Sequence, residues 1–238
     1  MNLIDLSVKK LSQSIRNNKV TSVDICKAFI KQIKKKESKV KAWEYFNEKK
    51  ILKEARKLDK KKKILKTIGP LYGIPIALKD IVSTSDMPTK FGTRIKLKDY
   101  KKLDAQIVKI LKQAGAIIMG KTVTCELAFL SPSITKNPID LSRTPGGSSS
   151  GSAAVIAAKM APLSIGTQTG GSVIRPASFC GVVGYKPSYG LISTNGILKT
   201  SYHLDQVGVF GNSVEDVKIL SEILFSKDKL TKKKTLFK

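Results

Sequence analysis

Apolar residues recur at helical spacing in the first part of the chain. Between positions 21 and 36 they fall three or four residues apart, at Ile25, Ala28, Phe29 and Ile33. Thr21 precedes this stretch with Asp24 three residues later, which is the arrangement of a helix-capping pair. The spacing predicts an amphipathic helix. A second basic helix is predicted over about 48–62, so the chain opens with a helical layer that we place at residues 1–66.

The spacing of apolar residues changes after Gly69 and Pro70, from helical periodicity to short continuous runs. Short apolar runs without polar alternation follow at 74–78 and 116–119, and such runs are typical of buried strands. A helix is predicted between them, over 104–113, with Gly115 as its stop. A last helix is predicted over 213–224, capped by Ser213 and Asp216.

The alternation of strand, helix and strand predicts an α/β fold, with a mixed, largely parallel sheet flanked by helices. We assign residues 67–226 to this core and 227–238 to a basic tail without a packing pattern. Loops at the ends of such strands are expected to carry the chemistry.

Composition narrows the class of protein. The apolar content of 41% is ample for a packed core. No run approaches the roughly 18 apolar residues of a membrane helix, and the first ten residues lack the apolar stretch of a signal peptide. The three cysteines are odd in number and widely spaced, which predicts neither disulfides nor a zinc site. We therefore expect a cytoplasmic protein without membrane association, metal or cofactor.

The formal charge of +26 raises nucleic acid as a partner. Only five of the 44 basic residues are arginine, whereas recognition of phosphate favours the bidentate guanidinium. We therefore interpret the lysine runs mainly as solvated faces or loop ends. An acidic or RNA partner remains the minority interpretation.

Two loops rich in glycine and serine carry the candidate chemistry. The first runs over 143–152 and precedes an alanine-rich stretch, and the second runs over 166–172 after a short apolar segment. Backbone N–H groups in such loops can bind an anion, but the Walker pattern and the dinucleotide fingerprint are both absent. Serines that only cap helices and shape turns are the simplest alternative for either loop alone.

A nucleophilic serine needs a base to activate it. His203 is the only histidine, and no pattern around it indicates a Ser-His-Asp arrangement. The predicted strand at 74–78 delivers Lys79 and Asp80 at its end. Burial there could lower the pKa of a lysine from about 10.4 to near 7, although most lysines in so basic a chain are surface charges.

The residues around these loops resemble the amidase signature family. The resemblance lies in Gly-Gly-Ser-Ser from Gly146, Thr-Gly-Gly-Ser at 169–172, the stretch from Arg175 to Gly184, and Gly73 to Asp80, which resembles the Gly-Ile-Pro-x-x-x-Lys-Asp element. It covers most of residues 1–225. Two separated serine loops and an upstream lysine agree with the family in order and spacing.

The resemblance implies roles for individual residues. Ser172 matches the acylated nucleophile, Ser148 the bridging serine that the family holds through a cis peptide bond, and Lys79 the base. Backbone N–H groups of Thr169, Gly170, Gly171 and Ser172 would form the oxyanion hole. We also expect Arg175 and Ser149 to contact the substrate.

The chain departs from the family pattern in several places. Gln168 occupies a position that is often Asp, and the arginine after the nucleophile sits three residues on, at Arg175, which favours a stand-alone amidase over the glutaminase component of a tRNA-dependent amidotransferase. The family pattern also continues well past Lys238, so we expect the core to be incomplete at its C-terminal side.

These features give three hypotheses of function. The first is hydrolysis of a small-molecule carboxylic amide, with release of ammonia or an amine, through an acyl-enzyme on Ser172. The second is a glutamine-hydrolysing subunit that works with partner subunits on a charged tRNA. The third is an inactive piece with a binding role. A homo-oligomer is also compatible with the sequence.

Overall fold

The computed structural model describes residues 2–95 and 103–225. The basic tail predicted at 227–238 lies outside the described residues. A six-stranded sheet, in the order β1-β3-β2-β4-β6-β5, forms the centre of this part of the chain. The strands are β1 (Trp43–Phe46), β2 (Pro75–Lys79), β3 (Ile117–Thr122), β4 (Leu163–Gln168), β5 (Val183–Tyr185) and β6 (Gln206–Gly211).

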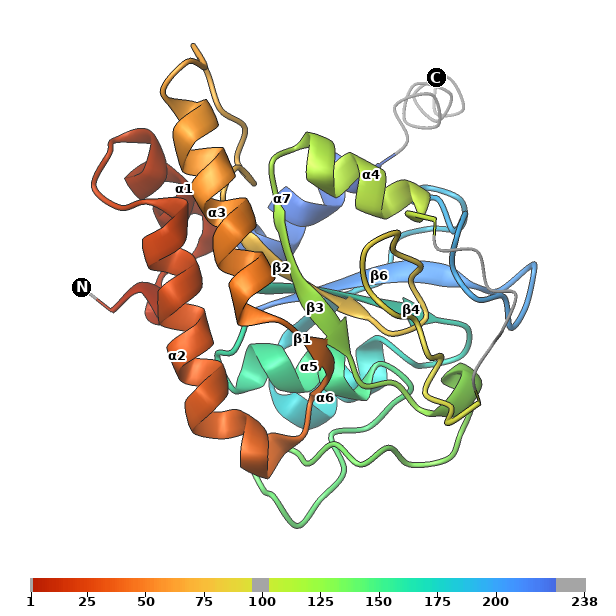
Figure 1. Cartoon of the computed structure of the whole chain (residues 1–238). Coiled ribbons are helices and arrows are strands. Elements are labelled where there is room, and N and C mark those ends of the chain that lie inside the picture. Colours follow the sequence, from red (N-terminus) through yellow and green to blue (C-terminus); the bar gives the residue numbers. More distant parts are fainter. Residues whose placement is uncertain (1, 96–102, 226–238) are drawn as a thin grey trace.

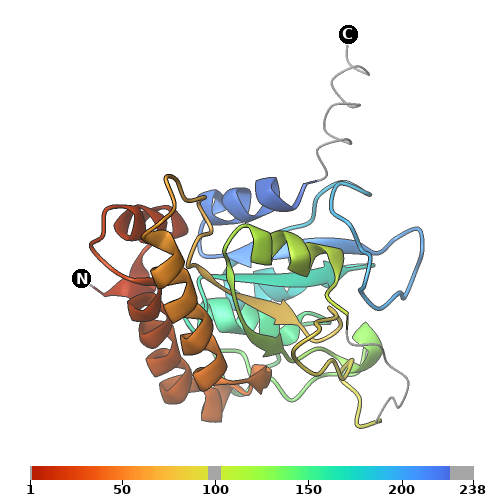
Figure 2. The same ribbon diagram turned by 45° about the horizontal axis from the view of Figure 1, so that its top comes forward.

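Helices flank the sheet on both faces. They are η1 (Leu3–Asp5), α1 (Val8–Arg16), α2 (Ser22–Val40), α3 (Glu48–Lys62), α4 (Gln106–Gln113), η2 (Glu126–Ala128), α5 (Ser150–Ala157), α6 (Ile174–Cys180) and α7 (Val214–Leu224). Helices α5 and α6 lie on one face, and α4 and α7 lie on the other (Figure 1). Figure 2 shows the same layers from a second direction, with α2 and α3 side by side at the N-terminal flank.

The expected mixed α/β sheet is confirmed, but parallel pairing is confined to its centre. Strand β2 pairs in parallel with β3 and with β4. The three outer pairings, β1 with β3, β4 with β6 and β6 with β5, are antiparallel. The sequence predicted more parallel pairing because β1, β5 and β6 did not stand out as strands.

Most predicted elements lie close to their predicted positions. Helix α3 has the predicted bounds, whereas α2 continues four residues past the predicted end, to Val40. The capping pair of α2 is present in both directions, and Ser213 accepts the backbone N–H of Asp216 at the start of α7. These ends follow local rules of hydrogen bonding, which is why the sequence alone identifies them.

The two long N-terminal helices are joined by a carboxylate. Asp59 of α3 accepts the backbone N–H groups of Ser22 (2.8 Å) and Val23 (3.1 Å) at the first turn of α2. Those N–H groups have no partner within the helix, and a negative charge is favourable at a helix N-terminus. The pair of helices is thereby fixed as one layer beside the sheet.

Candidate functional site

Lys79 is the last residue of β2, at the centre of the sheet. Its side chain is fully buried. The Nζ atom donates to Ser148 Oγ at 2.7 Å and to Thr167 Oγ1 at 2.9 Å. Thr167 comes from the neighbouring parallel strand β4, so two strands and the first serine loop converge on one amine.

Burial changes the acidity of this amine. Removal from water disfavours the charged form and lowers the pKa of Lys79 to about 7, although the negative charge of the Asp205 carboxylate opposes the change. A lysine with this pKa exchanges a proton readily near neutral pH. Once neutral, it can accept the Ser148 proton through its lone pair.

Ser148 follows a cis peptide bond, between Gly147 and Ser148, as the resemblance implied. The carbonyl oxygens on both sides of that bond are held. Arg175 donates to Gly147 O from Nε (3.0 Å) and Nη2 (2.6 Å). The Ser148 carbonyl accepts the N–H of Cys125 and the hydroxyl of Thr124, each at 3.1 Å.

Ser149 connects the same loop to β4. Its hydroxyl donates to Thr167 O at 3.1 Å and lies 3.2 Å from Thr167 N, which donates to it. Ser149 is fully buried, so its hydroxyl serves to dock the serine loop on the strand. The expectation that Ser149 contacts substrate remains a prediction.

The second loop, Thr169 to Ser172, is anchored at both ends. The Thr169 hydroxyl donates to Asp205 Oδ1 at 2.5 Å. After the loop, Gln168 Oε1 accepts the N–H groups of Val173 (2.8 Å) and Ile174 (3.0 Å). Gln168, the departure from the family pattern, thus caps the start of α6.

Between these anchors the backbone donors of the loop are unpaired. In the described part of the chain, the N–H groups of residues 169–172 make no hydrogen bond, and neither does the Ser172 hydroxyl. Gly170 is exposed, and a Cβ there would meet nothing within 4 Å. The donors are therefore accessible to a ligand oxygen.

The structure brings two of the three predicted catalytic residues into direct contact, Lys79 and Ser148. Ser172 is half-buried in the loop that follows β4 and is not hydrogen-bonded to either of them. Its loop lies against theirs, because Arg175, three residues on, binds Gly147 O and Gly146 packs against Pro176.

Arg175, predicted to contact substrate, has its guanidinium on the Gly147 carbonyl, although the residue is exposed. Sequence reasoning did not identify Thr167 as a partner of the lysine or Thr124 as a partner of the serine loop. For Thr167 a signal existed, since it lies inside the second glycine- and serine-rich loop at 166–172, two residues before Thr169. His203 is exposed and away from these contacts.

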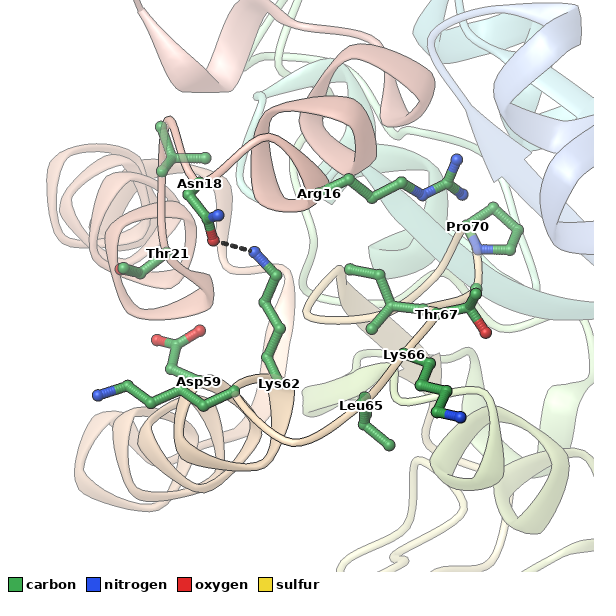
Figure 3. Close-up of a pocket in the computed structure, with 13 residues that line it drawn as sticks. Arg16, Asn18, Thr21, Asp59, Lys62, Leu65, Lys66, Thr67 and Pro70 are labelled. Carbon is green, nitrogen blue, oxygen red and sulfur yellow. Dashed lines mark hydrogen bonds between the residues drawn. The ribbon is translucent and has the colours of Figure 1, made fainter.

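Two cavities of similar volume lie in different parts of the structure. One of about 820 Å³ is lined by Thr124, Lys90 and Glu126, beside the backbone that holds the Ser148 carbonyl. Another, of about 910 Å³, lies between α1, α3 and the 63–70 segment. Figure 3 shows that its basic side chains diverge: Lys62 reaches Asn18, Arg16 points toward Pro70, and Lys66 points away. That second cavity contains none of the predicted site residues and no convergent anion site.

Other kinds of site find no support in the described ranges. No cluster of three or more His, Cys, Asp or Glu in residues 2–95 and 103–225 could hold a metal ion. No helix in the same ranges is long and apolar enough to span a membrane. The three cysteines are free and buried.

The sequence of this chain matches a known protein family and several curated proteins. The Amidase family model matches residues 24–237. The chain is 43% identical over 236 residues to the second glutamyl-tRNA(Gln) amidotransferase A-subunit of Clostridium acetobutylicum, a match that covers 97% of this chain and 49% of that protein. The corresponding A-subunit from Fusobacterium nucleatum is 42% identical, covering 95% of this chain and 48% of that protein.

The fold also matches solved structures of amide-hydrolysing enzymes. Peptide amidase from Stenotrophomonas maltophilia matches with a TM-score of 0.87 at 31% identity, over 95% of this chain and 49% of that one. A fatty acid amide hydrolase matches with a TM-score of 0.88 at 27% identity, over 95% and 42%. The chain spans about half the length of the relatives it matches.

Proposed function

Because the chain belongs to the amidase family, we propose that it carries the relay of a serine amidase that hydrolyses a linear carboxylic amide. The observation that carries this proposal is the 2.7 Å contact between Lys79 Nζ and Ser148 Oγ, made by a lysine with no exposure to water. A buried amine next to a hydroxyl, with its pKa lowered to about 7 by burial, is suited to act as a base.

The relay moves one proton in two steps. Neutral Lys79 accepts the Ser148 proton, and Ser148 accepts the Ser172 proton as Ser172 Oγ bonds to the amide carbon. The carbonyl oxygen becomes an oxyanion, which the N–H groups of Thr169, Gly170, Gly171 and Ser172 would stabilise. The proton then returns through Ser148 to the leaving nitrogen as the C–N bond breaks.

Water completes the reaction. It attacks the acyl-enzyme on Ser172 while the same relay accepts its proton, and the carboxylic acid leaves as Ser172 regains its hydrogen. No step requires a cofactor. The cavity beside Thr124 is of a size that suits a small-molecule amide, and we retain Arg175 and Ser149 as candidate substrate contacts.

A second candidate is a glutamine-hydrolysing subunit that works with partner subunits and a charged tRNA. It is favoured by the names of the relatives that match at about 40% identity, which are A-subunits of glutamyl-tRNA(Gln) amidotransferases. The third candidate is an inactive piece with a binding role. Three free cysteines fit a reducing compartment, and we place each function in the cytoplasm.

Labelling by a fluorophosphonate tests the proposed function directly. The reagent phosphonylates an activated serine, so peptide mass spectrometry of the full chain should find the adduct on Ser172. Ser172→Ala should abolish it, and Ser178→Ala, a change on the exposed face of α6, should leave it intact. An adduct on Ser149 or Cys180 would assign the nucleophile elsewhere, and no adduct on any residue would favour the binding role.

A further inference from the structure

Asp205 lies opposite the start of the loop that carries Ser172. Strands β4 and β6 pair antiparallel, and their last backbone pair joins Gln168 to Gln206. The same register places Thr169 opposite Asp205, where a side-chain bond replaces the backbone ladder. The Thr169 hydroxyl donates to Asp205 Oδ1 at 2.5 Å and lies 2.8 Å from the Thr200 hydroxyl.

The carboxylate of Asp205 is fully occupied by protein donors. Its Oδ1 also accepts the Thr200 hydroxyl (2.7 Å), and Oδ2 accepts the N–H groups of Thr200 (2.7 Å) and Ser201 (3.0 Å). A carboxylate offers about four acceptor positions. Asp205 borders a cavity of about 320 Å³, yet no acceptor position remains for a ligand there.

From this geometry we propose that Asp205 is a positioning residue for acylation, which fixes the loop from Thr169 to Ser172 against the 200–205 segment. The inference rests on the proposed function. The loop is held at both ends. Asp205 accepts the hydroxyl of Thr169, its first residue, and the side chain of Gln168 accepts the N–H of Val173, directly after its last residue. Between them lie two glycines, whose backbone has the widest conformational freedom of any residue. Without the Asp205 anchor, the oxyanion donors and the nucleophile lose their fixed relation, which must hold to about half an ångström.

Asp205 also acts on the site through its charge. Burial tends to raise the pKa of its carboxyl, but the hydrogen bonds from Thr169 and the 200–201 segment hold that pKa below its ordinary value. The carboxylate is therefore ionised at neutral pH. Its charge favours protonated Lys79, against the effect of burial. The two groups that contact the amine directly, Ser148 and Thr167, are uncharged hydroxyls.

Two substitutions separate the contact from the charge. Thr169→Val removes the donor and leaves the carboxylate. Asp205→Asn removes the charge but also replaces one acceptor oxygen by an N–H donor, so its readout is the pH midpoint and the Lys79 pKa and not the labelling rate. Thr169→Ser restores the hydroxyl. Asp104→Asn is the matched control, because Asp104 also ties a loop, by accepting from Ser85 N and Ser85 Oγ, but contacts no residue of the site.

The measurements are the rate of fluorophosphonate labelling of the full chain across pH and the Lys79 pKa from NMR of the side-chain amine. Thermal melting of each variant shows that the fold is retained. We expect Thr169→Val to slow labelling by on the order of 10- to 100-fold with the same pH midpoint, and Thr169→Ser to label close to the wild-type rate. Asp205→Asn should move the pH midpoint and the Lys79 pKa to lower values, and Asp104→Asn should change neither.

The outcomes distinguish this inference from the proposed function. If wild type is not labelled, the proposed function fails and the positioning role falls with it. If wild type is labelled on Ser172 and folded Thr169→Val is labelled equally fast, the positioning role alone is overturned. An unchanged Lys79 pKa in Asp205→Asn would overturn the electrostatic part.

Discussion

Two fully buried lysines, Lys79 and Lys121, show how partners decide the chemistry of a side chain. Lys121 Nζ lies 3.0 Å from Asp80 Oδ1 and also donates to Thr89 Oγ1 at 2.8 Å. Burial lowers the pKa of Lys121, but the Asp80 carboxylate acts in the opposite direction. Lys79 has only hydroxyls as direct partners. One lysine therefore belongs to an ion pair, and the other is suited to lose its proton.

Replacing Lys79 by Met should raise the stability of the fold and abolish activity. The folded-state pKa of about 7 lies below the ordinary 10.5. Below about pH 7 the buried ammonium therefore destabilises the folded state to its full extent, and this destabilisation decreases as the pH rises toward 10.5. We expect Lys79→Met to raise the free energy of unfolding by about 2 kcal/mol near pH 6 after the lost hydrogen bonds are deducted, with a smaller gain near pH 9. Denaturant unfolding at several pH values measures this.

The same substitution should also change the enzymatic activity. Wild-type turnover should rise with pH through about 7, as Lys79 loses its proton, and Lys79→Met should be inactive at every pH. Lys121→Met is the control. It leaves the Asp80 carboxylate buried without its partner, so it should destabilise the fold by about 3–5 kcal/mol. A stabilised Lys121→Met with a destabilised Lys79→Met would reverse the assignment.

At the scale of elements, the turn from Gly146 to Ser149 is held from three directions. Arg175 of α6 binds one carbonyl, the Thr124–Cys125 segment after β3 binds the next, and Ser149 docks on β4. These elements are distant in the sequence. The geometry of Ser148 thus depends on how α6, β3 and β4 are packed and not on the turn alone.

Gly147→Ala tests how closely these elements pack. A Cβ at Gly147 would lie 2.6 Å from Cys125 Sγ, so we expect a loss of about 1–3 kcal/mol of stability from overpacking and slower labelling of Ser172. Adding Cys125→Ala removes the atom that clashes and should restore most of the stability. Gly170→Ala, where a Cβ meets nothing within 4 Å, should melt near the wild-type temperature. A double variant no more stable than Gly147→Ala would place the cost elsewhere.

At the scale of the whole molecule, an apolar groove lies beside the edge strand β5. It has a volume of about 330 Å³ between β5 and α7, and Val183, Val217 and Phe225 line it. Nearby, Val214 is 70% exposed. An unpaired strand edge with adjacent apolar surface invites association. The relatives have about twice the length of this chain, and their additional half could cover such a surface.

A chimera tests whether a complementary half completes the enzyme. We expect the 238-residue chain alone to bind a hydrophobic dye and to hydrolyse amides slowly. Fusion to the second half of the Clostridium acetobutylicum relative should reduce dye binding and raise turnover by at least about tenfold, because a supported site holds its geometry. The same chimera with Ser172→Ala should lose turnover and keep the low dye binding. A lone chain that is monomeric, dye-free and as active as the chimera would show that it is self-sufficient.

The sequence by itself determined the features that depend on local rules. Helical spacing and capping pairs specified α2, α3 and α7, and a short apolar run specified the strand that ends at Lys79. The order of the two serine loops and the lysine was enough to indicate the family and its relay, because those motifs are contiguous in sequence.

Only the tertiary structure decided the features that depend on distant partners. Lys79 contacts Ser148 and Thr167 across separations of 69 and 88 residues, so the partners that surround its amine could not be identified from the neighbouring residues in the sequence. The outer strands β1 and β5 are short, with four and three residues, and neither is fully buried. Neither contains an apolar run long enough to predict a strand. They form because β3 and β6 offer them backbone hydrogen-bond partners. The anchor between Thr169 and Asp205 exists only because β4 and β6 pair in one register.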